Sequence, residues 1–342
     1  MRVLVTGALG NLGQAVLDAL VARGHTVTAF DRPTPHNRRV AHGYGSRVLF
    51  RWGDITDPVA VGEATLGQEV VVHMAFVIPR LSATGRGSEE APTWAEAVNV
   101  GGTRILIDAL RRQPQPPRLL FTSSLHIYGR TMHLEPPRRV HELPSPVEHY
   151  ARHKVVAERL VKESGLTWTV FRLGAALPVR LILDPGMFDV ALDNRIEFVH
   201  RRDVALAVAN ALDTEEVWGR VWHIGGGPRC QFIYRDMVRM IMETVGVGML
   251  PAEAFNPVPY PTDWLDTRES QAVLRFQQHT FDDYLAELRA LLGPTRRRLI
   301  AMFRPLVRFY LLAHSPYLTL TRAWYWAWHL PEPNGRFSMM PG

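Results

Sequence analysis

The sequence has very little cysteine: Cys230 is the only one among 342 residues. A single cysteine excludes an internal disulfide and is typical of a protein in a reducing cytoplasm. Cysteines and histidines do not cluster with the spacing of metal ligands, so we expect no metal site. The first predicted strand begins at residue 2, and we therefore expect no signal peptide and a cytoplasmic protein.

The sequence also lacks a clean run of about 20 apolar residues, the length of a membrane-spanning helix. An aromatic and basic stretch near the C-terminus, 295–329, is interrupted by Arg308, His314, Pro316 and Arg322. Such a segment lies in a membrane interface, packs on its own chain or forms a subunit contact. We expect self-packing or a homodimer contact, with peripheral membrane contact through 295–329 as the alternative.

Motifs that read nucleic acid are missing as well. The formal net charge is +6, but most arginines are scattered along the chain and no nucleic-acid-binding pattern accompanies them. Hydrophobic residues make up 46% of the sequence, enough for one large domain or two lobes. We expect a globular protein whose partner is a small-molecule substrate and not a nucleic acid.

The N-terminus carries a glycine-rich turn between a predicted strand, 2–5, and a predicted helix, 14–22. Gly7 allows a sharp turn, Gly10 lets phosphates approach the backbone, and Gly13 lets the helix pack closely on the strand. The free N–H groups at the helix N-terminus favour a pyrophosphate. The pattern therefore predicts a dinucleotide-binding turn, and its expected cofactor contacts also include Leu9, Asn11 and Leu12.

The next predicted strand, 26–30, ends at an acidic residue. Asp31 lies 18 residues beyond Gly13, where an acid hydrogen-bonds the adenosine ribose hydroxyls. An acid at this position repels a 2′-phosphate, so NAD is favoured over NADP. The neighbouring Arg32 could instead hold that phosphate, with Arg38 and Arg39 in reserve, which keeps NADP as the alternative cofactor.

A second signature pairs a phenol with an amine. Tyr150 and Lys154 are four residues apart at the start of a helical pattern, so they share one helix face. A nearby ammonium and a cationic nicotinamide both favour the phenolate, and we expect the Tyr150 pKa to be lowered. Tyr150 can then exchange a proton with a substrate hydroxyl or carbonyl. Lys154 would hold the nicotinamide ribose, and Ser124 would stabilise the substrate oxygen.

These motifs together resemble the extended short-chain dehydrogenase/reductase superfamily, which includes the NAD-dependent epimerase/dehydratase family. The resemblance runs in order over roughly residues 1–227. Further segments that carry it are Gly53-Asp54-Ile55, His73-Met74-Ala75, Asn99-Val100-Gly101-Gly102-Thr103, Phe121 to Gly129, Phe171-Arg172-Leu173-Gly174 and Phe198 to Ala205. The resemblance implies cofactor contacts at Asp54, Ile55, Met74, Ala75 and Asn99, besides those of Tyr150 and Lys154.

The resemblance also implies the fold. We expect an α/β protein with a doubly wound parallel sheet (Rossmann), a small C-terminal substrate lobe and a helical C-terminal extension. The Rossmann domain is predicted over 1–174 and completed by about 198–227. The substrate lobe is predicted over 175–197 and 228–293, with helices at 234–245 and 281–292. The aromatic and basic extension is predicted over 294–342.

His126 departs from the family pattern. The sugar-nucleotide dehydratases of the family place two acids directly after the catalytic Ser or Thr, whereas this chain has Leu125 and His126. Loss of both acids argues against that dehydration chemistry. His126 is either a second acid/base group, as an epimerase would need, or a residue that hydrogen-bonds substrate or backbone. We favour a substrate contact.

The substrate insert is short. Only residues 175–197 separate Gly174 from Phe198, and the run 175–183 is largely apolar. This favours a small or lipophilic alcohol, aldehyde or ketone over a nucleotide sugar. We therefore predict an NAD(P)-dependent oxidoreductase that transfers hydride at a hydroxyl or carbonyl carbon. A nucleotide-sugar epimerase and a non-catalytic cofactor-sensing protein are the alternatives.

Overall fold

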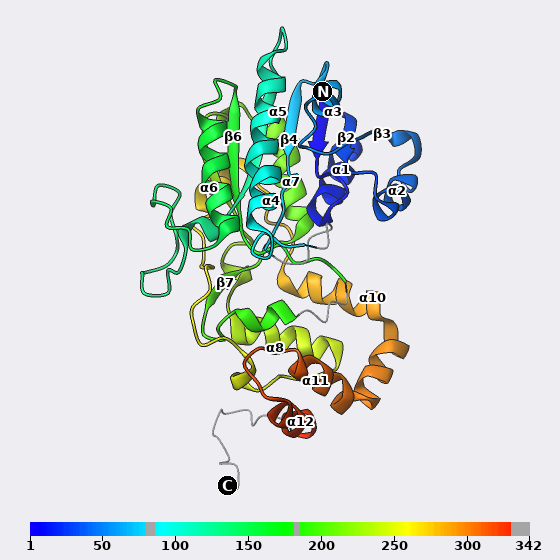
Figure 1. Ribbon diagram of the computed structural model, residues 1–342, viewed down its shortest axis with the longest axis vertical. Helices are drawn as coiled ribbons and strands as arrows, with labels where there is room; N and C mark the ends of the chain where they lie inside the picture. The colour runs from blue at the N-terminus through cyan, green and yellow to red at the C-terminus, as the bar shows by residue number, and fades with distance from the viewer. Residues whose placement is uncertain (80–85, 181–184, 330–342) are drawn as a thin grey trace. The chain divides into compact units, whose positions relative to one another are not determined.

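The structure is a computed structural model that describes residues 1–79, 86–180 and 185–329. The chain forms two compact units (Figure 1). Unit 1 comprises 1–178, 197–231 and 261–280, and unit 2 comprises 179–196, 232–260 and 281–342. The chain crosses between the units five times. Two of these crossings lie inside short strands, β7 (Arg195–Glu197) and β9 (Gln231–Ile233), which pair in a small sheet.

Unit 1 is built on a seven-stranded sheet in which every neighbouring pair is parallel. The strand order is β3-β2-β1-β4-β5-β6-β8. The strands are β1 (Arg2–Thr6), β2 (Thr26–Asp31), β3 (Val48–Trp52), β4 (Val70–His73), β5 (Arg118–Ser124), β6 (Trp168–Leu173) and β8 (Val221–Ile224). The order reverses between β1 and β4, which is where doubly wound sheets bind their ligands. The predicted fold class is confirmed.

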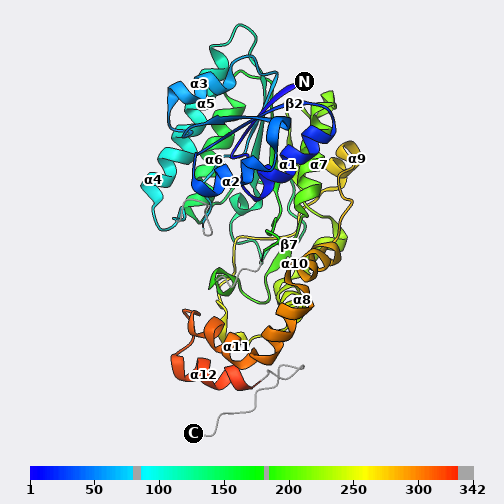
Figure 2. The same cartoon turned by 90° about the vertical axis from the view of Figure 1, so that its right-hand side faces the viewer.

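Helices cover both faces of this sheet, so its strands are apolar on both sides. Val3 and Val5 of β1 belong to the core cluster beneath α1 and α7, whereas Leu4 points into the cluster beneath α5 and α6. Figure 2 shows the two layers of helices on opposite sides of the strands. The helices of unit 1 are α1 (Asn11–Ala22), α2 (Pro35–His42), α3 (Pro58–Thr65), α4 (Pro92–Glu96), α5 (Gly102–Arg111), α6 (His149–Lys162), α7 (Arg201–Leu212) and α9 (Arg268–Leu274).

Unit 2 is helical. Its helices are α8 (Tyr234–Val245), α10 (Phe281–Met302), α11 (Arg304–Ala313) and α12 (Leu320–Trp328). The helix predicted over 234–245 is confirmed by α8. The helix predicted over 281–292 forms the first part of α10, which is broken at Gly293 by its left-handed φ of 66° and extended ψ of 168°. Of the predicted segments, 181–183 and 330–342 lie outside the described residues.

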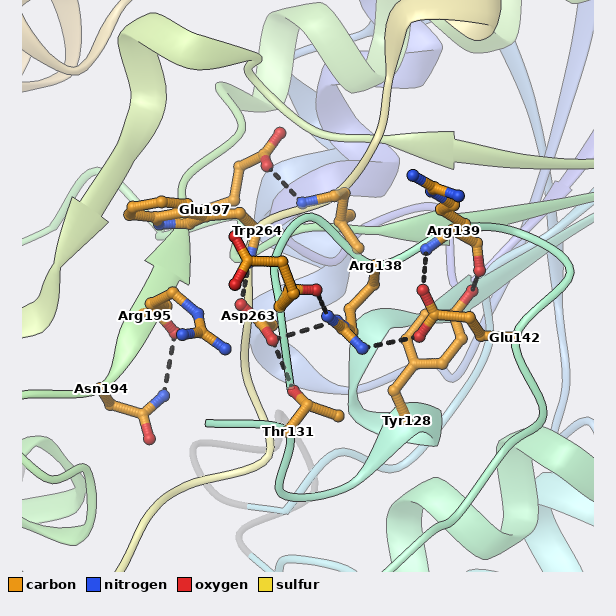
Figure 3. Close-up of polar contacts among 12 residues, drawn as sticks. Tyr128, Thr131, Arg138, Arg139, Glu142, Asn194, Arg195, Glu197, Asp263 and Trp264 are labelled. Carbon is orange, nitrogen blue, oxygen red and sulfur yellow. Dashed lines mark hydrogen bonds and ion pairs between the residues drawn. The ribbon is translucent and has the colours of Figure 1, made fainter. Parts of the chain in front are cut away.

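The boundaries of the two units differ from those of the predicted domains. Residues 261–280, which we predicted in the substrate lobe, pack within unit 1. The backbone of Arg138 donates to Trp264 O at 2.7 Å and accepts from Asp266 N at 2.9 Å. The buried Arg138 side chain lies between Asp263 and Glu142 (Figure 3). The bonds from Arg138 to residues 263–266 join segments more than 120 residues apart, which no local sequence pattern reveals.

The described residues of the extension belong to unit 2, together with α8 of the predicted substrate lobe. Arg297 Nε donates to Thr244 O at 3.1 Å, and Ser315 Oγ donates to Ala254 O at 2.7 Å. The segment therefore packs on the lobe around α8. Along the described part of the chain, no helix has both the length and the apolar character needed to cross a membrane.

Candidate active site

The glycine turn has the geometry that a dinucleotide requires. Gly7 has a φ of +65°, and a Cβ there would lie 2.7 Å from Ala75 N. A Cβ on Gly13 would lie 2.4 Å from Gly7 O, so both positions exclude any side chain. A Cβ on Gly10 would meet only Gly7 O at 3.4 Å, which is ordinary contact. The chain itself thus leaves space at Gly10, where a phosphate would approach.

The N-terminus of α1 carries no acidic side chain of its own. Gly10 occupies the N-cap position and brings no side chain, and the first turn of α1 has no acidic residue. The backbone N–H groups of Asn11, Leu12 and Gly13 lie in that first turn, where N–H groups lack intrahelical acceptors. Together with the positive end of the helix dipole they suit a pyrophosphate, so the residues present fit the predicted cofactor.

Asp31 ends β2 and is already oriented toward the glycine turn. Its Oδ2 accepts from Leu9 N at 2.8 Å, and its Oδ1 accepts from Arg32 N at 2.8 Å and Asn37 Nδ2 at 3.1 Å. Burial raises the pKa of Asp31 above its usual value, while these donors oppose the rise. The sequence analysis missed Asn37, a buried residue that holds the carboxylate in place.

The loop after β4 is fixed by buried polar side chains. Thr6 Oγ1 accepts from Met74 N and Ala75 N, both at 3.2 Å, so these predicted contact residues lie against the glycine turn. Asn99 Oδ1 accepts from Val77 N at 2.6 Å, and Asn99 Nδ2 donates to Val77 O at 3.0 Å. Asn99 therefore shapes this loop, and a direct contact between Asn99 and the cofactor stays a prediction.

The predicted adenine contacts lie beyond β3. Asp54 is engaged locally, because its Oδ1 accepts from both the backbone N and the Oγ1 of Thr56. Ile55 is buried against the start of α5, where a Cβ on Gly102 would lie 2.7 Å from its Cγ2. The Ile55 side chain thus belongs to the core, and any contact between this segment and adenine stays a prediction.

Ser124, Tyr150 and Lys154 come together at the carboxyl end of β5 and the first turns of α6. Ser124 lies close enough to the Tyr150 hydroxyl for its side chain to lower the Tyr150 pKa. Lys154 Nζ donates to Thr122 O at 2.5 Å and lies 5.7 Å from the Tyr150 ring centroid. Glu89 accepts from the backbone N of Tyr150 at 2.9 Å, which fixes the start of α6. The three predicted catalytic residues share one site.

The expectation of a lowered Tyr150 pKa is not met in the chain alone. Burial raises the pKa of Tyr150 to about 12, the Ser124 side chain opposes this, and the Glu148 carboxylate adds to it. Burial also lowers the pKa of Lys154 to about 7, against the attraction of Glu158. The Lys154 amine lies 3.6 Å from the centroid of the Phe76 ring and 4.8 Å from that of Phe121. This apolar surrounding weakens the cation on which the prediction relied.

His126 has a carboxylate partner that the sequence analysis missed. Its Nδ1 lies 2.8 Å from Glu148 Oε2, and its ring meets the Tyr150 ring edge-on with centroids 5.7 Å apart. Both side chains are mostly buried, with 17% of His126 and 16% of Glu148 exposed. Glu148 precedes α6 directly, and proximity to Tyr150 in sequence is the only signal that could have found it. The site thus holds a histidine–carboxylate pair beside the phenol.

A buried polar network underlies the site. Arg172 on β6 pairs with Glu158 on α6 at 2.8 Å and donates to the Tyr128 hydroxyl at 2.7 Å. The Tyr128 hydroxyl also lies 2.6 Å from His223 Nε2. Glu158 is one turn beyond Lys154, and although burial opposes ionisation, Arg172 holds the Glu158 pKa below its usual value. The network anchors the helix that carries Tyr150 and Lys154.

Comparisons with known proteins agree with this geometry. A 3 beta-hydroxysteroid dehydrogenase/Delta 5→4-isomerase of Mycobacterium tuberculosis is 34% identical over 167 residues, 47% of this chain and 42% of that protein. Sterol demethylase protein B of Methylococcus capsulatus is 31% identical over 230 residues, 62% of this chain and 66% of that protein. The chain thus spans about two fifths of the first relative and just under two thirds of the second.

Solved structures share the fold. UDP-glucuronic acid 4-epimerase from Bacillus cereus, solved with UDP-glucuronic acid and NAD, superposes with a TM-score of 0.68 at 21% identity. The match covers 85% of this chain and 99% of that one. The model of the NAD dependent epimerase/dehydratase family matches residues 3–177, just over half of the chain and the part that holds the glycine turn, Ser124, Tyr150 and Lys154. The chain therefore belongs to the NAD dependent epimerase/dehydratase family.

Proposed function

We propose that this protein is an NAD-dependent dehydrogenase or reductase that acts on a hydroxyl or carbonyl carbon of a small or lipophilic substrate. The observation that carries the proposal is the convergence of Ser124, Tyr150 and Lys154 in the same unit as the glycine turn. A cofactor-sensing protein without catalysis would have no need of this arrangement, which argues against that alternative.

The residues of the chain suit proton transfer at the substrate oxygen. When NAD is bound, it supplies the hydride chemistry, accepting hydride from an alcohol carbon or returning it to a carbonyl as NADH. Tyr150 takes the hydroxyl proton in oxidation and gives it back in reduction. Ser124 donates a hydrogen bond to the oxygen on which negative charge develops. Lys154 lies one turn away, so a protonated Lys154 stabilises the Tyr150 phenolate, and the phenolate in turn stabilises the protonated amine.

The substrate class is supported by what lines the site. The Phe76 ring lies 5.8 Å from the Tyr150 ring, and His126 with Glu148 offers one polar contact beside it. The two relatives named above carry sterol or steroid in their names. An apolar ring beside Tyr150, together with these relatives, favours a lipophilic alcohol or ketone.

An epimerase is the second candidate, and the His126–Glu148 pair is the observation that favours it. An epimerase must return hydride to the opposite face of its substrate, and a second proton-exchanging group helps it do so. Net formation of NADH with an alcohol substrate would support the dehydrogenase. Isomerisation of a substrate without net change in NADH would support the epimerase.

Replacing Tyr150 with Phe tests the proposal. The substitution removes the hydroxyl and keeps the ring that packs on Phe76, so the fold and cofactor binding should survive. Loss of a positioned acid/base group lowers the rate by about 10²–10⁴-fold. NADH formation is measured with a panel of sterols, aromatic alcohols and short alcohols. The control is Tyr310→Phe, since the Tyr310 side chain is exposed in unit 2. Turnover by Tyr150→Phe equal to that of the unmodified protein would overturn the mechanism.

Asp31 tests the cofactor preference. Its carboxylate, held by Leu9 and Asn37, should repel the 2′-phosphate of NADPH. We expect NADH to bind more tightly, and Asp31→Ala to narrow or invert the difference between the two dissociation constants. Titration by nicotinamide fluorescence measures both constants. Tighter binding of NADPH by the unmodified protein would mean that Arg32 outweighs Asp31.

The expected homodimer stays a prediction.

A further inference from the structure

The described part of the extension, 295–329, has an unusual charge. It contains six arginines and no Asp or Glu, so it carries as much positive charge as the formal net charge of the whole chain, +6. Arg308 is buried, but Arg296, Arg298 and Arg322 are exposed, and Arg297 and Arg304 are partly exposed. A surface without any acid attracts anionic partners and repels a second copy of itself.

The same segment exposes large apolar side chains. Nine of them between 299 and 328 have 39–66% of their surface exposed. They are Leu299, Met302, Phe303, Leu306, Tyr310, Tyr317, Leu320, Trp324 and Trp328. Among the described residues, the large apolar side chains that are exposed elsewhere are all aliphatic, and the exposed aromatic ones all lie in this segment. Exposed apolar patches of this kind mark interaction sites.

The exposed side chains share faces of ordered helices. On α11, Leu306 and Tyr310 lie on one side, and Arg308, Leu311 and Leu312 are buried on the other. On α12, Trp324 and Trp328 are exposed one turn apart, while Ala323 and Ala327 are buried. Phe309 of α11 contacts Trp324 with ring centroids 5.7 Å apart, which joins the two helices into one aromatic surface.

A buried guanidinium holds this surface in shape. Arg308 donates to Met249 O at 2.8 Å, to Trp326 O at 3.1 Å and to His329 O at 3.2 Å. It thereby ties α11 to the end of α12 and to the loop after α8. The exposed aromatic residues therefore belong to helices that are hydrogen-bonded to each other and to the loop after α8.

We propose that residues 295–329 form a docking surface for an anionic lipid bilayer. Trp and Tyr prefer the headgroup region of a bilayer, and arginines at its edge pair with lipid phosphates. The helices are too short to span, so the segment lies on the surface with Trp324, Trp328, Leu306 and Tyr310 inserted. The proposal rests on charge and exposure in unit 2 and does not depend on the catalytic function.

Vesicle flotation of the full-length protein tests the proposal. We expect flotation with vesicles of phosphatidylcholine and phosphatidylglycerol, and much less with phosphatidylcholine alone. Arg296→Gln with Arg298→Gln should weaken partitioning roughly fivefold for each arginine. The matched control is Arg111→Gln with Arg112→Gln, an exposed pair at the end of α5, which should float like the unmodified protein.

The apolar contribution is tested by Trp324→Gln with Trp328→Gln. Its control is Leu66→Gln with Leu143→Gln, since these side chains in unit 1 are 68% and 88% exposed. The tryptophan variant should lose flotation and remain monodisperse, and the leucine variant should retain flotation. Protease resistance of α11 and α12 verifies that unit 2 is folded in each variant. Tyr150→Phe should float normally, which separates this proposal from the catalytic one.

Three outcomes would overturn the proposal. The first is no flotation of the unmodified protein with anionic vesicles. The second is equal loss of flotation in the control variants. The third is a fall in oligomer mass on replacing Trp324 and Trp328, measured by light scattering, without any vesicle binding, which would assign the surface to a second copy of the chain.

Discussion

One buried cation from each unit makes the comparison, Lys154 from unit 1 and Arg308 from unit 2, and the two are held in opposite ways. Lys154 in unit 1 lies among the rings of Phe76 and Phe121 and donates to the Thr122 carbonyl. Arg308 in unit 2 donates to five carbonyls, those of Val247, Gly248, Met249, Trp326 and His329. The lysine is nearly surrounded by carbon, whereas the arginine is saturated with oxygen acceptors.

The difference follows the chemistry of the two side chains. An ammonium in an apolar pocket shifts its pKa readily, and burial lowers that of Lys154 to about 7. Burial and the neighbouring Arg304 lower the pKa of Arg308 only to about 10, so it stays charged at neutral pH. An amine with unused donors can serve a ligand or a reaction, whereas a saturated guanidinium can only hold structure. Burial of a cation thus serves function at Lys154 and architecture at Arg308.

Replacing Lys154 with Met should produce the largest effect and test this contrast. Turnover should fall by about 10²-fold or more because the group that supports Tyr150 is lost. Thermal stability should rise, because an expensive buried amine is replaced by an apolar side chain of similar length. Lys162, the only other lysine, is the control, since it is one-third exposed on the same helix. Activity retained in Lys154→Met, or a loss of stability confined to it, would contradict the contrast.

The sequence predicts the position of the Lys154 site in unit 1, but not the direction in which the Tyr150 pKa shifts. The spacing of Tyr150 and Lys154 and the glycines at 7 and 13 follow local rules, because helix periodicity and the absence of a Cβ can be read from adjacent residues. The direction of the Tyr150 pKa could not be read, since it depends on burial by Phe76 and on Glu148. Those contacts arise only when β4, β5 and α6 are assembled.

The structural role of Arg308 in unit 2 could not be predicted from local sequence patterns. Arg308 looked like an interruption of an apolar stretch, and its role became visible only with the carbonyls of Met249 and Trp326 around it. The placement of 261–280 in unit 1 likewise depends on backbone bonds between Arg138 and residues 264–266. Side chains and segments that are satisfied by partners distant in sequence leave no periodic signal.

Replacing Arg308 with Met should have the next largest effect, on stability and not on cofactor binding. Each buried carbonyl left without a donor costs about 1–3 kcal/mol, and Arg308 serves several. We expect unit 2 to unfold at lower urea concentration and α11–α12 to become sensitive to protease, while NADH still binds unit 1. The exposed Arg322→Met is the control and should change little. Equal protease resistance of Arg308→Met and the unmodified protein would show that the guanidinium is dispensable.

The smallest expected effect is on the pH dependence of stability, which Lys154 should change between pH 7 and pH 9.5 and Arg308 should not. The Lys154 pKa is about 7 in the folded protein and 10.5 as a free side chain, so between these values the unfolded chain binds more protons. By linkage, stability then rises with pH across this window, by at most about 1.4 kcal/mol per unit, and the penalty is constant below pH 7. The stability of the unmodified protein minus that of Lys154→Met should therefore increase from pH 7 to pH 9.5 in urea titrations. The Arg308 pKa is lowered to about 10, so its window begins only near pH 10, and the stability difference from Arg308→Met should stay flat over the same range. A flat difference for Lys154 would mean that its amine stays charged in the fold, and the two buried cations would then differ only in their number of acceptors.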